Sequence, residues 1–105
     1  MTADKDYHEV LWPRGARQQK RRALARRPNS LAGATIAFAW DYLFRGDEVF
    51  ATLEEELKKR FAGTRFISWK EIGNTHGSNE REVVANLPRR LRELGVDAVI
   101  SGMGC

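Results

Sequence analysis

The sequence predicts an α/β domain built on a three-stranded parallel sheet, preceded by a basic N-terminal extension over residues 1–33. Three short apolar runs stand at 34–40, 64–69 and 98–100, and two helical patterns separate them. The first run lacks clean alternation of apolar and polar residues, which is typical of a strand buried on both faces. Strands that alternate with helices favour a parallel sheet with right-handed crossovers.

The extension carries most of the basic charge. Residues 1–33 have eight Lys/Arg against three Asp/Glu, a net +5, whereas residues 34–105 have ten against eleven, a net −1. Two interpretations stay open. One is an arm that binds a phosphate backbone or an acidic partner by releasing counterions. The other is a solvated extension that has no ligand.

Nucleic acid is the less favoured partner of this extension, because its aromatic residues precede the basic run and do not interleave with it. Residues 17–27 are a candidate helix, since Pro28 and Asn29 would end it. Residues 10–12 are apolar and precede Pro13, so they are expected to form a short extended segment able to dock on the domain.

The first strand is expected at residues 34–40, and a loop at 41–46 follows it. Helical spacing then places four apolar side chains on one face: Phe50, Leu53, Leu57 and Phe61. Acidic residues stand in the first turn of this helix and basic residues in the last, which suits the helix dipole. Gly63 suits a left-handed cap just beyond the helix.

The second strand is expected at residues 64–69 and the third at 98–100, with a polar loop at 71–79 and a second helix between them. The apolar face of that helix is Val84, Leu87, Leu91 and Leu94. Ser78 or Asn79 is its expected N-cap. Pro88 removes a helical hydrogen bond at a cost of about 3 kcal/mol, so we expect a kink or a break near Leu87.

This order of strand, helix, strand, helix and strand is half of a doubly wound, Rossmann-like sheet. Residues 34–105 are therefore expected to be a partial α/β domain, incomplete at its C-terminus, because a parallel sheet needs cover on both faces. The extension, a partner chain or missing sequence would supply that cover. The partners left open are a second copy, which would make a homo-oligomer, and a missing C-terminal half.

The composition excludes several classes of protein. It is 42% hydrophobic and 30% charged, as in globular proteins, and no apolar run approaches the roughly 18 residues that span a bilayer. Without a secretory signal, we expect no membrane partner and a cytoplasmic location.

A single cysteine forms no internal disulfide, and no Cys/His spacing or phosphate-binding glycine fingerprint stands in the chain. We therefore expect no metal and no cofactor.

Three loops should converge at the carboxyl edge of the sheet, where open α/β folds bind their ligands. A histidine within reach of a thiol lowers the pKa of the thiol and makes it a nucleophile. The candidate catalytic residues from these loops are Cys105, His76 and Asp41. The candidate substrate-binding residues are Gly102, Gly104, Asn74 and Arg45.

Each candidate also has a purely structural interpretation. His76 can be a loop histidine bonded to the backbone, and Asp41 can hold a turn. Cys105 can be an inert terminal residue, although glycines on both sides of Met103 favour function, since they let backbone approach a ligand closely. Four aromatic residues are most simply core side chains: Phe38, Trp40, Phe66 and Trp69.

Three segments resemble the UGSC-motif family: Trp40–Glu48, Gly73–Gly77 and Val99–Cys105. Members of that family are bacterial proteins with a selenocysteine–Gly–Ser–Cys motif, or Cys–Gly–Ser–Cys where selenium is absent. The resemblance covers residues 28–105 and implies that the motif would follow directly after Cys105. Because UGA encodes selenocysteine and is otherwise a stop codon, we expect the chain to be the front part of a selenoprotein closed at that codon.

The resemblance implies a thiol or selenol redox protein, a reductase-type oxidoreductase similar to the selenoprotein B components of glycine and betaine reductases. Its small-molecule or thiol substrate is not identified, and the 105-residue chain alone is expected to be inactive. The alternative is a small binding module that uses its basic arm to contact nucleic acid or an acidic partner. A stand-alone enzyme with Cys105 as nucleophile is disfavoured, because a terminal residue is poorly anchored and its carboxylate opposes a thiolate.

Overall fold

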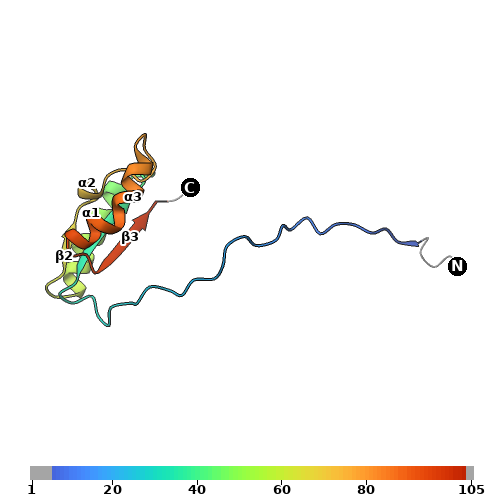
Figure 1. Cartoon of the computed structure of the whole chain (residues 1–105). Helices are drawn as coiled ribbons and strands as arrows, with labels where there is room; N and C mark the ends of the chain where they lie inside the picture. The colour runs from blue at the N-terminus through green and yellow to red at the C-terminus, as the bar shows by residue number, and fades with distance from the viewer. Residues whose placement is uncertain (1–5, 104–105) are drawn as a thin grey trace.

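The computed structural model describes residues 6–103 and contains a three-stranded, all-parallel sheet with helices packed against it (Figure 1). The strands are β1 (Thr35–Trp40), β2 (Arg65–Ile67) and β3 (Ala98–Gly102), in the spatial order β2-β1-β3. The helices are α1 (Gly46–Arg60), α2 (Trp69–Ile72) and α3 (Glu80–Glu93). The predicted α/β fold is confirmed.

The central strand β1 is buried along its whole length and divides the core in two. Successive strand residues point to opposite faces of the sheet. Phe38 and Trp40 pack on one face against Phe50 of α1. Ala37 and Ala39 pack on the other face, where their neighbours include Ile72 of α2 and Leu87, Leu91 and Leu94 at α3. The sheet therefore has α1 on one side and α2 with α3 on the other.

The strand order creates a switch point beside β1. The chain passes from β1 to β2 on one side through α1, and from β2 back across β1 to β3 through α3. In doubly wound sheets, ligands bind outside the carboxyl ends of the strands where the strand order reverses. Here that place lies between the end of β1 and the end of β3.

The second strand is shorter than predicted, and the expected strand at Ser68 and Trp69 is wrong. β2 ends at Ile67, and the Ser68 hydroxyl accepts a hydrogen bond from the Lys70 backbone N–H at 3.2 Å. This side-chain cap starts the short helix α2, since serine satisfies an otherwise unpaired N–H at a helix N-terminus. β3 is longer than predicted and pairs with β1 as far as Gly102.

Helix α3 runs without interruption from Glu80 to Glu93, so the break considered near Leu87 does not occur. Pro88 and Val84, the residue four positions before it, are both exposed. Water can therefore reach the Val84 carbonyl, which Pro88 leaves without a helical donor. Asn79 is the N-cap, but its side chain makes no capping hydrogen bond.

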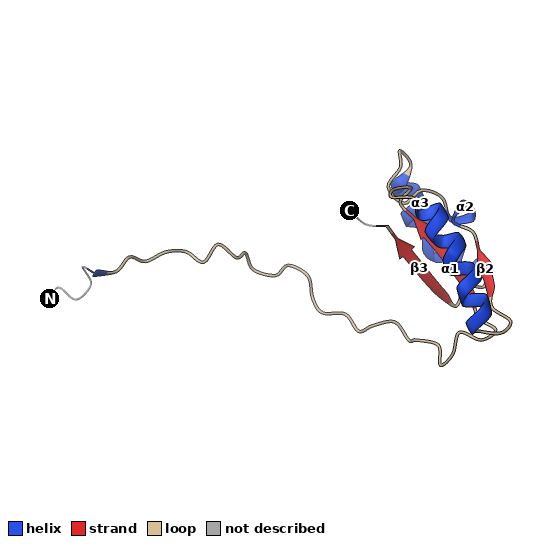
Figure 2. Cartoon of the chain, turned by 180° about the vertical axis from the view of Figure 1, so that it is seen from behind, coloured by secondary structure: helices blue, strands red, loops and turns tan. Residues whose placement is uncertain are grey.

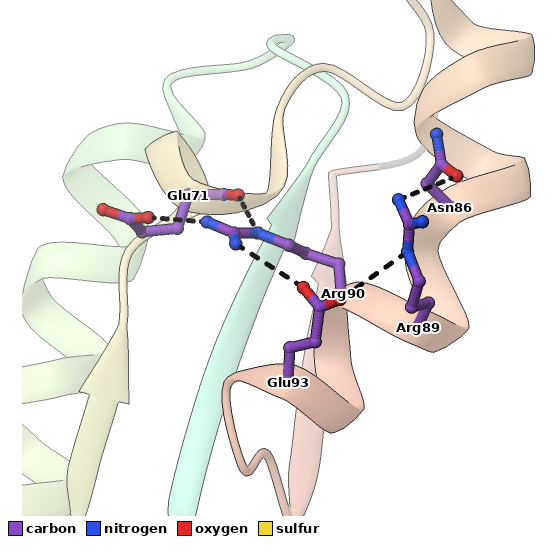
Figure 3. A network of polar contacts seen from close by, with 5 residues as sticks. All are labelled: Glu71, Asn86, Arg89, Arg90 and Glu93. Carbon is purple, nitrogen blue, oxygen red and sulfur yellow. Dashed lines mark hydrogen bonds and ion pairs between the residues drawn. The ribbon is translucent and has the colours of Figure 1, made fainter.

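Arg90 joins α2 to α3 (Figure 3). Its guanidinium donates to the Glu71 carboxylate at 3.1 Å and to the Glu71 backbone carbonyl at 3.4 Å. Glu93 lies on the other side of the same guanidinium at 3.9 Å. These groups are about half exposed, so the network orients α2 on α3 more than it stabilises the fold.

The N-terminal extension runs away from the folded part as an exposed, extended arm (Figures 1 and 2). The candidate helix at residues 17–27 is wrong, because no helix is present there. Like charges at i,i+4 spacing, as at Arg17 and Arg21, oppose a helix. Helices in proteins are stabilised mainly by packing of an apolar face, and residues 17–27 are exposed and have no such packing.

Strand β3 is covered on one face only. Ile100 packs into the core beside α1, whereas Val99 points to the other face and is 42% exposed. Ser101 is exposed on that face as well. Within the described residues, the outer edge of β3 pairs with no further strand. The sheet therefore presents an open edge beside the switch point.

Candidate functional site

Asp41 ties the end of β1 to the end of β3. The residue is only 8% exposed, and its Oδ1 accepts hydrogen bonds from the backbone N–H groups of Met103 at 3.0 Å and Leu43 at 3.2 Å. Its own N–H donates to the Gly102 carbonyl at 3.2 Å. The Asp41 carboxylate therefore holds the backbone on both sides of the switch point.

The loop between β1 and α1 has an unusual backbone. Tyr42, Phe44 and Arg45 have φ values of 65°, 55° and 55°, in the left-handed region that residues other than glycine rarely adopt. Such a conformation persists only where its surroundings hold it. Asp41 binds the Leu43 N–H from one side, and the Trp40 indole N–H donates to the Leu43 carbonyl at 2.9 Å.

Gly46 completes the support of this loop. It is buried at the start of α1, against the indole ring of Trp40. A Cβ at this position would overlap that ring. The absence of a side chain at Gly46 therefore allows the Trp40 indole to lie where its N–H reaches the loop.

Three aromatic rings form a cluster at the same edge of the sheet. The ring centroids of Trp40 and Tyr42 are 4.8 Å apart, those of Trp40 and Trp69 are 4.7 Å apart, and those of Tyr42 and Trp69 are 5.1 Å apart. Phe38 and Trp40 are buried core residues as predicted, and Phe66 and Trp69 are half-buried and pack against that core. Sequence reasoning missed Tyr42, which is 41% exposed. The signal available for it was an aromatic side chain two residues after the first strand.

The polar loop at residues 73–77 docks beside the end of β1. The Thr75 backbone N–H donates to the Trp40 carbonyl at 3.4 Å, and Asn74 bridges to Trp40 as a further parallel pair. Asn74 Oδ1 accepts from the His76 N–H at 2.9 Å. The exposed His76 ring places Nδ1 3.0 Å from the Thr75 hydroxyl. The structure thus brings this loop to the same edge as Asp41.

The remaining candidates are placed differently. Arg45 is exposed and forms an ion pair with Glu48 at 2.8 Å, so its side chain pairs with α1 and not with Asp41. Gly102 has room for a side chain, since the nearest atom to an added Cβ is Phe50 Cζ at 4.0 Å. Gly104 and Cys105 lie outside the described residues. Their assignments, and the approach of His76 to the Cys105 thiol, stay predictions.

Residues 6–103 contain no group of three His, Cys, Asp or Glu side chains that could hold a metal ion. None of the helices described there is long and apolar enough to cross a membrane.

A cavity of about 170 Å³ opens between α1 and the end of β2. Its lining includes the aromatic side chains of Phe38, Phe50, Phe66 and Trp69.

Comparison with known proteins identifies one family. The sequence model of the UGSC family matches residues 9–105, which include the extension from Glu9 onward, the aromatic edge and β3. No curated protein and no solved structure matches the chain. Because the match covers nearly the whole of the 105-residue sequence, the chain belongs to the UGSC family.

Proposed function

We propose that this chain forms one side of a thiol or selenol redox site in a reductase-type oxidoreductase. The observation that carries the proposal is the hydrogen bond from Met103 to buried Asp41 at the switch point, in a chain of the UGSC family. The family resemblance implies a selenocysteine–Gly–Ser–Cys motif directly after Cys105. Asp41 would then hold the backbone that leads into the reacting residues.

The chemistry of such a motif is a two-electron cycle. A selenol and a thiol separated by Gly and Ser lose two protons and two electrons when the Se–S bond forms, and those electrons reduce the substrate. An external dithiol returns them by exchange through a mixed intermediate. A reducing, cytoplasmic compartment suits these free groups.

The candidate catalytic residues take different parts in this proposal. Asp41 Oδ1 already accepts two backbone hydrogen bonds, so Asp41 is a positioning residue and not a general base. His76 is exposed on the neighbouring loop, where its ring is accessible for proton transfer. Cys105 would stand directly before the selenocysteine.

The open side of β3 supports a site completed by further chain. Val99 and Ser101 are exposed, and the outer edge of β3 has no strand partner within residues 6–103. An unpaired edge with an exposed β-branched residue is a template for another strand. We therefore propose that the second half of a doubly wound sheet pairs there, and that the 105-residue chain alone is inactive.

The coding DNA directly after the Cys105 codon tests the proposal. The expected result is an in-frame UGA followed by codons for Gly, Ser and Cys and by further α/β sequence. Unrelated sequence or a run of further stop codons would overturn it. Assay of the purified 105-residue chain should show no thiol-dependent turnover, and robust turnover that is lost in Cys105→Ala would contradict the proposed inactivity.

The exposed arm supports a second candidate function, that of a small binding module. Residues 7–28 form no helix or strand, and Arg14 lies over the Trp12 ring at 5.9 Å. A basic arm of this kind would bind nucleic acid or an acidic partner in a salt-dependent way. Binding to nonspecific DNA or RNA that is lost on deletion of residues 1–33 would favour this function. Tight association with a separately supplied C-terminal half would favour the redox proposal.

A further inference from the structure

Exposed large apolar side chains gather at two places in the described chain. On the arm they are Val10, Leu11, Trp12 and Leu24, between 76% and 94% exposed, together with Tyr7. On the folded part, four of the six lie within residues 42–49: Tyr42, Leu43, Phe44 and Val49. Single exposed apolar residues are ordinary, but a group of neighbours indicates an interaction site.

The charges at these two places are opposite. Residues 14–27 of the arm carry seven Lys/Arg and no acid, whereas residues 46–57 of α1 carry five Asp/Glu and no base. Asp47 and Glu55 have no ion-pair partner within residues 6–103. Complementary charge of this kind steers two surfaces together and sets their register.

A shallow, open groove on the outer side of α1 combines both properties. Glu48, Val49, Thr52 and Leu53 line it, and its volume is about 350 Å³. Glu56 lies one turn beyond Thr52 on the same side of the helix. We name these five residues the α1 groove. Glu48 and Glu56 stand at its two ends with Thr52 between them, and Val49 and Leu53 form the apolar side next to Thr52.

The arm contains a segment that matches the α1 groove in spacing. In an extended chain, residues two apart point to the same side, so Arg22, Leu24 and Arg26 form an apolar side chain flanked by two cations. Four extended residues span about 13 Å. Glu48 and Glu56 are eight helical residues apart, or about 12 Å. Leu24 can therefore lie against Val49 and Leu53 while both arginines reach a carboxylate.

The carboxylates of the α1 groove already have partners that can be exchanged. Glu48 pairs with Arg45 at 2.8 Å, and Glu56 pairs with Lys59 at 3.2 Å. Both pairs are more than half exposed. Such surface pairs contribute little stability, so replacing them by pairs to the arm costs little.

We infer that the arm of one copy of this chain binds the α1 groove of a second copy, and that the exchange is reciprocal. The arm leaves the folded part beside the C-terminal end of α1, where the Gly33 N–H donates to the Ala62 carbonyl, and runs outward (Figure 2). The family match begins at residue 9, so the arm is part of the shared sequence. A two-fold arrangement uses both arms, and the first contact makes the second intramolecular.

Sedimentation equilibrium of the full chain tests the inference. The expected species is a dimer of twice the 12.0-kDa chain mass, whose association weakens as salt rises. Leu24→Ser should weaken dimerisation at least about tenfold. Val84→Ser is the matched control, since it removes a 52% exposed valine from α3 and should leave the association unchanged. A wild-type chain that stays monomeric at every concentration would overturn the inference.

A charge-swap pair decides between exchange and folding back of the arm onto its own α1. One chain carries Arg22→Glu with Arg26→Glu, and the other carries Glu48→Arg with Glu56→Arg. Each alone should be monomeric, and their mixture should form a one-to-one heterodimer, because both contacts are restored between the two chains. A mixture that stays monomeric, while a single chain with all four changes binds its own arm, would show folding back and overturn the exchange.

Discussion

Asp41 Oδ1 accepts the backbone N–H of Met103 at 3.0 Å, across 62 residues of sequence. The same oxygen accepts the N–H of Leu43 at 3.2 Å. One buried carboxylate therefore sets the exit of β1 and the exit of β3 together. Hydrogen bonds to a carboxylate are stronger than those between neutral groups, which makes this a firm anchor for the end of β3.

Replacing Asp41 should loosen both strand exits. Asp41→Ala leaves two backbone N–H groups without their acceptor in a buried place and should lower the free energy of unfolding by about 2–4 kcal/mol. Asp41→Asn keeps a carbonyl oxygen and should lose about 1 kcal/mol. Urea denaturation measures both values.

Asp47→Ala is the matched control for Asp41, because it removes an exposed aspartate from the first turn of α1. Its expected loss is at most about 1 kcal/mol, from the helix dipole. Faster amide hydrogen exchange at Leu43 and Met103 in Asp41→Ala would locate the effect. Unchanged exchange at both amides would contradict the anchoring role.

Gly46→Ala should destabilise the domain although alanine favours helices. An added Cβ overlaps the Trp40 indole, and relief requires the ring or the helix to move. Overpacking of this kind costs about 1–3 kcal/mol. The gain of about 1 kcal/mol in helix propensity applies to helix interiors, and Gly46 is the first residue of α1, so the loss should outweigh the gain. A shift in tryptophan fluorescence should accompany the loss. Gly102→Ala is the control, with 4.0 Å to the nearest atom, and equal losses in both would contradict the steric account.

Phe38→Ala should remove much of the stability of the domain. Phe38 is 3% exposed, and its ring centroid lies 4.7 Å from that of Phe50 and 5.7 Å from that of Phe66. Truncating a buried phenylalanine costs about 3–5 kcal/mol. Val84→Ala on the exposed side of α3 should change stability by less than about 0.5 kcal/mol. Chemical denaturation with both variants checks the contrast.

The left-handed backbone at Arg45 predicts an order of stability among its variants. Arg45 has φ 55° and ψ 33°, a conformation that glycine adopts freely and β-branched residues do not. Arg45→Gly should change the free energy of unfolding by no more than about 1 kcal/mol, because the exposed ion pair with Glu48 contributes little stability. Arg45→Val should lose about 1–2 kcal/mol. Thermal unfolding measures the order. A midpoint for Arg45→Val equal to or higher than that for Arg45→Gly would rule out the left-handed conformation.

Local patterns in the sequence were sufficient to predict most elements. The apolar run at 34–40 and the spacing from Phe50 to Leu57 are signals within single segments, and β1 and α1 form there. Two of the errors fall where two local signals compete. At Ser68 a capping hydroxyl outweighed an apolar run, and at Pro88 access of water to the helix allowed α3 to continue.

The candidate site could be predicted as a place but not as a set of contacts. Parallel topology brings the ends of β1 and β3 to one edge, so sequence alone placed Asp41 and Asn74 there. It did not reveal that Asp41 binds Met103, that Tyr42 stacks on Trp40, or that Arg45 turns to Glu48. The contacts of Tyr42 and Arg45 lie in a loop with left-handed backbone at three residues that are not glycine, so the sequence gives no signal of that conformation.

By itself the sequence determined the fold class and the likeness to the UGSC family, because strand burial, helical spacing and local motifs are properties of neighbouring residues. Only the tertiary structure decided that Asp41 is an anchor and that the arm stands away from its own domain. The physical reason is distance along the chain. The hydrogen bond from Met103 to Asp41 joins residues 62 positions apart, so it forms only after the chain has folded. The exposure of apolar side chains on α1 is likewise decided by which other segments pack against the helix.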